Sequence, residues 1–131
     1  MIVDSSALIA ILRQEPEADI LAEAIDDAQI VQISAGTMFE ASMVADRIKD
    51  AGFGKRFDTL CERIEMVVVP FDEIHARIAR NAYREFGKGS GHKAQLNFGD
   101  CFAYALAKVT GEPLLYKGKD FQHTDVASAL K

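Results

Sequence analysis

The sequence lacks several features that define large classes of protein. It has only two cysteines, Cys61 and Cys101, and no CxxC or other metal-ligand spacing, so we expect free thiols. No apolar run reaches the ~18–20 residues that a membrane-spanning helix needs. The first residues, MIVDSSALIAIL, hold an aspartate where a signal peptide has a cationic region. These absences predict a cytoplasmic protein with no membrane segment.

The sequence also offers no nucleophilic triad. Its three histidines, His75, His92 and His123, are scattered, and none has a convincing partner in sequence for a Ser–His–Asp site. We therefore expect all three histidines at the surface or in loops.

The charge is unevenly distributed along the chain. A net charge of −5 argues weakly against nucleic acid as a partner. However, residues 1–50 contain ten acidic and three basic side chains, whereas residues 51–131 contain ten acidic and twelve basic ones. A basic surface in the second part of the chain is therefore compatible with the composition.

Short apolar runs alternate with longer helical segments. We expect strands at residues 1–3, 29–34, 66–69 and 113–116, and helices at 5–13, 16–28, 35–50, 53–65, 71–86 and 100–110. This alternation predicts an α/β fold, with a mostly parallel sheet of 4–5 strands flanked by helices on both faces. The strands are apolar or nearly so, which is typical of strands covered on both sides. Nothing indicates a linker or a second domain, so residues 1–131 form a single domain.

Acidic side chains recur near the ends of the expected strands, where open α/β sheets bind ligands. Asp4 follows the first strand, Asp100 opens a helix that is apolar from Cys101 to Ala107, and Asp120 follows the last strand. Aspartate is also a common N-cap residue, which explains each of them taken alone.

Glu40 is harder to explain, because it lies opposite the polar stripe of helix 35–50, where an uncompensated carboxylate is costly. An ion pair with Arg47, or a position at the helix edge, would also account for it.

Taken together, Asp4, Glu40, Asp100 and Asp120 would converge on one end of the sheet. Carboxylates at close range repel one another, and some would keep a proton unless a cation lay between them. Oxygen ligands favour Mg²⁺ or Mn²⁺ over zinc. We therefore predict a magnesium site, which would also let Asp100 open a buried helix.

Four motifs make the chain resemble a PIN domain, and more closely a VapC-type ribonuclease toxin of a type II toxin–antitoxin system. They are MIVDSSALIAIL, TMFEAS, LNFGDCFAYALAK and PLLYKGKDFQHTDV. The resemblance implies a metal-dependent endoribonuclease that uses Mg²⁺, with Mn²⁺ as a possible substitute.

The resemblance also implies which residues form the site. Asp4, Glu40 and Asp100 match the acidic ligand positions of the family. Many PIN domains carry another acid two residues before an Asp–aromatic pair, where this chain has Gly118. Asp120 is therefore our candidate for the fourth acid, with Asp125 second. Ser5 or Ser6 matches a hydroxyl position that often follows the first aspartate.

The resemblance further implies partners: a cognate VapB-type antitoxin, an RNA substrate, and a second copy of the chain. The helices within residues 35–65 are the predicted dimer face, with core packing as the alternative. The RNA target, the cut site, the number of metal ions and the oligomeric state are open at this point.

RNA also requires a positively charged surface. Arg77, Arg80 and Arg84 are spaced to share one stripe of helix 71–86, and lysines follow in the glycine-rich loop 86–97. The candidate RNA-binding residues are Arg80, Arg84, Lys88, Lys93 and Lys117. A solvated charged helix face is the alternative explanation.

Three alternative protein classes fit the sequence less well than a PIN-domain ribonuclease. A haloacid-dehalogenase-type phosphatase would need a second aspartate at the position of Ser6. A phosphoacceptor receiver domain would need an aspartate at the end of a central strand, where MVVVP ends in Pro70. The third is a catalytically inactive PIN-like module that binds RNA or a partner, and only loss of activity on mutation could exclude it.

Overall fold

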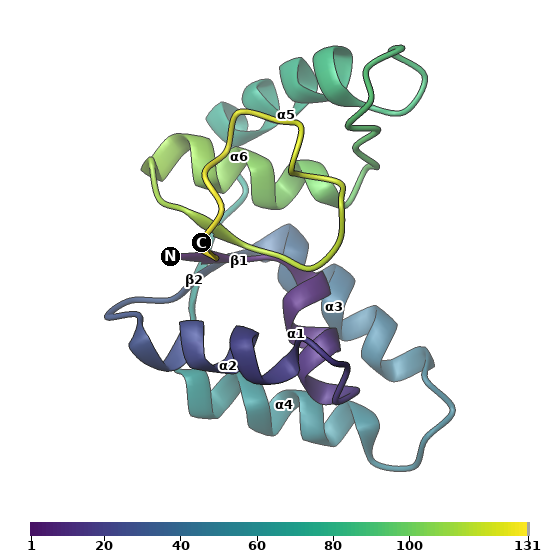
Figure 1. The fold of residues 1–131 in the computed structure, drawn as a ribbon, viewed down its shortest axis with the longest axis vertical. Helices are drawn as coiled ribbons and strands as arrows, with labels where there is room; N and C mark the ends of the chain where they lie inside the picture. Colours follow the sequence, from purple (N-terminus) through teal and green to yellow (C-terminus); the bar gives the residue numbers. More distant parts are fainter. Residues whose placement is uncertain (131) are drawn as a thin grey trace.

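The structure, a computed structural model, describes residues 1–130. Its elements, in chain order, are β1 (Ile2–Val3), α1 (Ser5–Leu12), α2 (Ala18–Asp27), β2 (Gln32–Ser34), α3 (Ala35–Arg47), α4 (Phe53–Ile64), β3 (Val67–Val69), α5 (Glu73–Phe86), α6 (Asp100–Thr110) and β4 (Leu114–Leu115). A parallel sheet separates α5 and α6 on one face from α1 to α4 on the other (Figure 1). The predicted α/β architecture is confirmed.

The strand order β3-β2-β1-β4 determines where a site can form. β1 pairs with both β2 and β4, with Ile2 in register with Gln32 on one side and Leu114 on the other. Successive strands run from β1 to β3 in one direction, and β4 then joins the opposite side. The switch point of the sheet therefore lies between β1 and β4, where sheets of this kind bind ligands beyond the carboxyl ends of their strands.

Neighbouring residues of the two-residue strands bury their side chains on opposite faces of the sheet. Ile2 and Leu114 belong to the core beside α5 and α6, whereas Val3 and Leu115 belong to the core beside α1 to α4. All four are fully buried, which confirms the predicted double-sided burial for β1 and β4.

The same prediction was wrong for β3. Val67 and Val68 are 50% and 47% exposed. The reason is the position of β3 at the edge of the sheet, where β2 is its only strand neighbour within residues 1–130.

Side chains cap α1, α3 and α5. Asp4 Oδ2 accepts a hydrogen bond from the Ser6 N–H at 3.1 Å, and Ser34 Oγ accepts one from the Gly36 N–H at 3.3 Å. Asp72 Oδ1 accepts one from the His75 N–H at 3.0 Å, so α5 begins after this cap rather than at residue 71.

The apolar segment after Asp100 forms the predicted buried helix. Every residue of α6 from Cys101 to Ala107 is buried except Phe102, which is half-buried. Gly111, with φ of 71°, ends the helix in the left-handed conformation that glycine adopts without strain.

The prediction of a surface or loop position was wrong for His75, which is only 4% exposed. It shares the buried face of α5 with Ala82 and Phe86, seven and eleven residues further on, and its ring meets the Phe71 ring edge-on with centroids 5.9 Å apart. His92 lies half-buried in the loop after α5 and His123 is exposed, as expected.

Among the residues that the structure describes, no helix is both long and apolar enough to cross a membrane.

Candidate functional site

Asp4 lies where β1 turns into α1, and its side chain is held by the next turn of the chain. Its Oδ2 accepts hydrogen bonds from the Ser6 N–H at 3.1 Å and the Ser6 hydroxyl at 2.6 Å. Its Oδ1 is buried and has no hydrogen-bond partner among residues 1–130. Burial raises the pKa of Asp4 to about 6, and the nearby charge of Glu40 adds to this, although the bonds from Ser6 oppose it.

Asp100 enters the site from the first turn of α6. Its N–H donates to Asn97 Oδ1 at 2.8 Å, and its own Oδ2 accepts from the Asn97 N–H at 3.0 Å. This reciprocal pair resembles a capping box, and it supplies polar partners for an aspartate at the start of a buried helix. Sequence reasoning missed Asn97, although a polar residue three positions before an acid is the usual signature of this motif.

The pKa of Asp100 is affected by its burial and by two neighbouring carboxylates. Burial raises the pKa of Asp100 to about 8, opposed by the hydrogen bond from Asn97. The charges of Asp4 and Asp120, and a side-chain hydrogen bond with Asp120, raise it further. Asp100 therefore lies close enough to both carboxylates to interact with them.

Glu40 approaches Ser5 and Gly99, the neighbours of Asp4 and Asp100, from α3. Its Oε1 accepts a hydrogen bond of 2.9 Å from the Ser5 hydroxyl, and its carboxylate lies against Gly99, directly before Asp100. Within residues 1–130, no basic side chain forms an ion pair with Glu40, so the alternative explanation through Arg47 is not supported.

The structure separates the two candidates for the fourth acid. Asp120 is exposed after β4 and interacts with Asp100. Asp125 instead accepts hydrogen bonds from the Tyr104 hydroxyl at 2.7 Å and Lys108 Nζ at 2.9 Å. Both partners lie further along α6, so Asp125 ties the C-terminal segment to that helix.

The four acids interact pairwise, and they do not form a closed cage. As the side chains stand, residues 1–130 contain no group of three or more Asp, Glu, His or Cys residues close enough to hold a metal ion. The interactions instead form a series of pairs, which join Glu40 to Asp4, Asp4 to Asp100, and Asp100 to Asp120.

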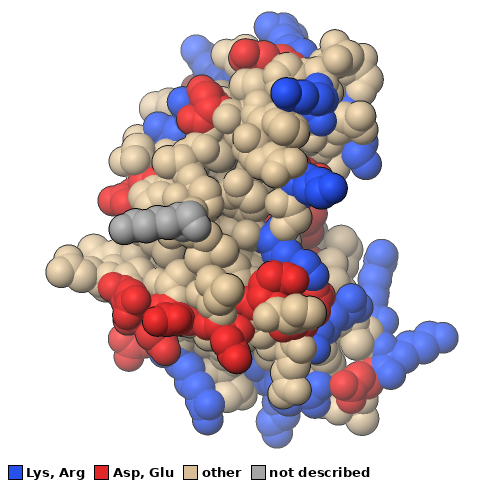
Figure 2. Space-filling view, in the orientation of Figure 1, with Lys and Arg blue, Asp and Glu red and all other residues tan. Residues whose placement is uncertain are grey.

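The predicted RNA-binding residues differ in their surroundings. Lys117 Nζ forms ion pairs with Glu15 and with Glu17 at 3.1 Å, so its charge is already partly neutralised. Arg80, Arg84, Lys88 and Lys93 are exposed, and none of them forms an ion pair within the described chain. On the face seen in Figure 2, acidic side chains gather in a band in the region of α2.

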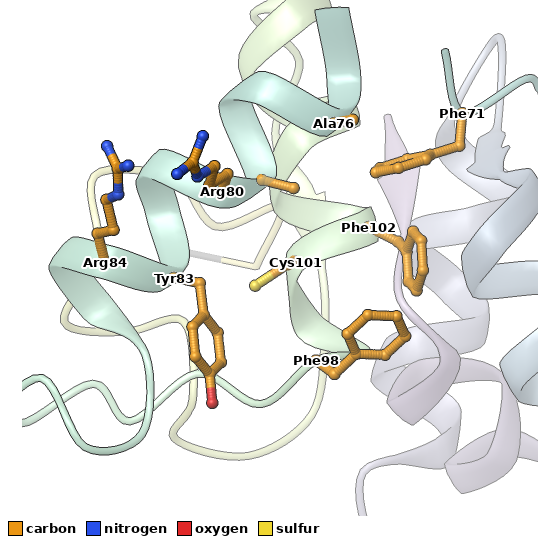
Figure 3. Close-up of a pocket in the computed structure, with 9 residues that line it drawn as sticks. Phe71, Ala76, Arg80, Tyr83, Arg84, Phe98, Cys101 and Phe102 are labelled. Atoms are coloured by element: carbon orange, nitrogen blue, oxygen red, sulfur yellow. The ribbon is translucent and has the colours of Figure 1, made fainter. Parts of the chain in front are cut away.

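An apolar cavity lies between α5 and α6 (Figure 3). Its volume is about 410 Å³, and its walls include Phe71, Tyr83, Phe98, Cys101 and Phe102. Arg80 and Arg84 lie at its edge, with their guanidinium groups directed away from the phenylalanines. Phe98 is 77% exposed, which is unusual for so large an apolar side chain.

Comparison with known proteins shows the family of the chain. The family model described as the PIN domain matches residues 1–127. Ribonuclease VapC28 of Mycobacterium tuberculosis is 51% identical over 130 residues, which is 99% of this chain and 98% of that protein.

Solved structures show the same fold at lower sequence identity. VapC20 of Mycobacterium tuberculosis, a sarcin–ricin loop cleaving toxin, has a TM-score of 0.72 at 13% identity and covers 96% of this chain and 95% of its own. A toxin–antitoxin complex from Klebsiella pneumoniae has a TM-score of 0.71 at 18% identity and covers 95% and 92%. From the family match and the close relatives, we conclude that the chain belongs to the PIN-domain family and, within it, to the VapC ribonuclease toxins.

Proposed function

We propose that the chain is a Mg²⁺-dependent endoribonuclease whose active site is the corner formed by Asp4, Glu40, Asp100 and Asp120. The observation that carries this proposal is the burial of Asp4 and Asp100, which are 3% and 8% exposed, beside each other at the switch point of the sheet. Two buried carboxylates without a basic partner are unfavourable for folding, and function is the usual reason to retain them.

The donor atoms suit a hard divalent cation. Asp4 Oδ1 is buried and has no hydrogen-bond partner within residues 1–130. Glu40, Asp100 and Asp120 likewise offer carboxylate oxygens as metal ligands. Such donors favour Mg²⁺, or Mn²⁺ in its place. Asp4 and Asp100 would bind the ion directly, whereas Glu40 and Asp120 would bind it through water.

When bound, the cation would lower the pKa of a water molecule and offset negative charge on the scissile phosphate. Ser6 holds Oδ2 of Asp4, which leaves Oδ1 for the ion, and Asn97 restrains Asp100 in the same way. Glu40 and Asp120 are the less buried acids, and they are the candidates to orient the attacking water and accept its proton.

The RNA would be bound by the exposed basic residues after β3. Arg80 and Arg84 on α5, with Lys88 and Lys93 in the following loop, would neutralise phosphate groups. Lys117 is a weaker candidate than we predicted from the sequence, because Glu15 and Glu17 compete for its charge.

We also propose a VapB-type antitoxin as the partner of this chain. The support is its membership of the VapC toxins and its likeness in fold to a chain of the Klebsiella pneumoniae toxin–antitoxin complex. Co-purification of the chain with a co-expressed antitoxin, and loss of ribonuclease activity in the complex, would test this assignment.

We propose a homodimer that keeps α3 from the predicted face and replaces α4 with the residues just before α6. Phe53 and Phe57 of α4 are buried in the core, so α4 has little apolar surface left to offer. On α3, by contrast, Phe39 is 72% exposed, and Phe98 is exposed just before α6. Sedimentation should show a dimer whose dissociation increases when Phe39 or Phe98 is replaced by serine.

The central experiment is incubation of the purified chain with total RNA, in Mg²⁺ and then in EDTA. We expect discrete fragments that require the metal and are absent with Asp4→Asn and Asp100→Asn. Asp125→Asn is the matched control and should still cleave. Fragments unaffected by Asp4→Asn and Asp100→Asn would place the activity elsewhere, and RNA binding without any cleavage would favour the inactive-module alternative.

A further inference from the structure

Helices α3 and α6 approach each other through two glycines. Gly36 on α3 faces the ring of Phe102 on α6, and Gly99 at the start of α6 faces the carboxylate of Glu40 on α3. A Cβ atom at either glycine would overlap the side chain that faces it. At each of these two contacts, a glycine at one helix leaves space that a side chain of the other helix occupies.

The backbone does not require glycine at position 99. Gly99 has φ of −63° and ψ of −37°, a conformation that alanine adopts readily. Gly99 is nevertheless buried, and a Cβ atom there would lie 2.5 Å from Cδ of Glu40 and 2.8 Å from its Oε1. The absence of a side chain at this position is therefore explained by the space that the Glu40 carboxylate occupies.

Ser5 restrains the same carboxylate from another direction. Its hydroxyl donates the 2.9 Å hydrogen bond to Oε1, and Ser5 directly follows Asp4 in the chain. The turn that carries the first acid of the site therefore also orients the Glu40 side chain.

We infer that Ser5 and Gly99 are positioning residues, which together place the Glu40 carboxylate in the acidic corner. This inference rests on the proposed function, because it assigns their purpose to a nuclease site that includes Glu40. The carboxylate is the end of a flexible side chain, so Gly99→Ala displaces the carboxylate while the helices stay in place.

Gly36 shows the contrasting case. The Phe102 ring that faces it is restrained by edge-on contacts with Phe71 and Phe98, whose ring centroids lie 4.7 Å and 5.1 Å away. Alanine at position 36 would press on this rigid group, so Gly36→Ala should lower stability, whereas Gly99→Ala should not.

A double-mutant cycle on RNA cleavage tests the inference. We expect Gly99→Ala and Ser5→Ala each to lower kcat about 10- to 100-fold, the loss typical of a displaced catalytic group. In a Glu40→Ala background, either change should cost less than about 2-fold, because the group on which it acts is gone. Ser5→Thr, which keeps the hydroxyl, should restore most of the rate.

Two matched controls are available. At Gly54 an added Cβ would lie 2.6 Å from Oδ1 of Asp46, an exposed carboxylate outside the corner, so Gly54→Ala should leave cleavage unchanged. Ser42→Ala removes a hydroxyl whose one hydrogen bond within residues 1–130 goes to the Met38 carbonyl, so this change should also leave cleavage unchanged.

A crystal structure of Gly99→Ala provides a readout that does not depend on activity. We expect the Glu40 carboxylate to move by about 1 Å or more, with the α3 and α6 backbones unchanged. An unmoved carboxylate would overturn the inference, as would losses that persist in full when Glu40 is alanine. If the wild-type protein cleaves no RNA, the proposed function fails. The crystal structure of Gly99→Ala would still show whether the residue at position 99 determines the position of the Glu40 carboxylate.

Discussion

The Ser6 hydroxyl donates a 2.6 Å hydrogen bond to Oδ2 of Asp4. The same hydroxyl accepts a 3.0 Å hydrogen bond from the backbone N–H of Lys117, which follows β4. One side chain therefore joins the two strand ends that border the switch point of the sheet.

Removal of this hydroxyl should weaken both the site and the fold. We expect Ser6→Ala to lower the free energy of unfolding by about 1–3 kcal/mol, since it leaves a buried carboxylate oxygen and the Lys117 N–H without that partner. Denaturant unfolding measures this loss. Thr59→Ala, which removes an exposed hydroxyl on α4, is the control. Equal stability of the Ser6→Ala and Thr59→Ala variants would show that the Ser6 bonds contribute little.

The metal-free protein should lose stability as the pH rises. The pKa of Asp4 is about 6 and that of Asp100 about 8, both above the ordinary value of 3.8. Between about pH 4 and pH 8 these groups therefore bind more protons in the folded state than in the unfolded state, so the free energy of unfolding falls with increasing pH.

Thermal unfolding in EDTA at pH 5 and pH 8 measures this effect. We expect the difference in Tm between the two pH values to shrink by roughly 5 °C or more in Asp100→Asn, because that variant cannot ionise at position 100. Asn should also stabilise the metal-free protein at pH 8. An identical pH dependence in wild type and Asp100→Asn would contradict the assigned pKa of Asp100.

Asp120 and Asp125 should respond in opposite ways to substitution. Asp120→Asn should lower cleavage about 10- to 100-fold with little change in stability, because Asp120 is exposed and its neighbour is Asp100. Asp125→Asn should instead cost about 1 kcal/mol of stability, because it weakens the bonds to Lys108 and Tyr104. Cleavage rates and unfolding curves for both variants distinguish a role in catalysis from a role in stability. Loss of cleavage in Asp125→Asn but not in Asp120→Asn would make Asp125 the fourth acid.

Binding of RNA should depend more on α5 than on Lys117. Fluorescence anisotropy with a labelled single-stranded RNA, measured with Asp100→Asn to prevent cleavage, reports affinity at several salt concentrations. Replacement of Arg80 and Arg84 by glutamine should weaken binding and reduce the salt slope by about 0.7 for each lost phosphate contact. Lys117→Gln should have the smaller effect, since that ammonium is paired with two glutamates. A larger effect of Lys117→Gln would show that RNA displaces those glutamates.

Local patterns predicted much of this fold because the determining features are themselves local. The apolar run after Asp100 predicted a buried helix, and a single aspartate after a short apolar strand predicted the position of Asp4. Both follow from which side chains can be buried next to one another along the chain. The convergence of distant acids at one end of the sheet stays a prediction, which rests on the assumption of parallel strands.

Other features depend on contacts that no local pattern contains. The exposure of Val67 follows from the strand order, which places β3 at an edge. The burial of His75 depends on which stripe of α5 faces α6. The space that Gly99 leaves for Glu40 joins residues far apart in the sequence, so neither residue alone reveals it. The pairing of Asn97 with Asp100, by contrast, could have been predicted, because a polar residue three positions before an acid is the signature of a capping box.

The most direct measurement is the anomalous scattering of Mn²⁺ bound in crystals of the protein. We predict a peak at the acidic corner, about 2.1 Å from Asp4 Oδ1 and from a carboxylate oxygen of Asp100, that disappears in crystals of Asp4→Asn. A peak at another site, or no peak at this corner with the metal at saturating concentration, would contradict the account of a metal-dependent ribonuclease centred on Asp4 and Asp100.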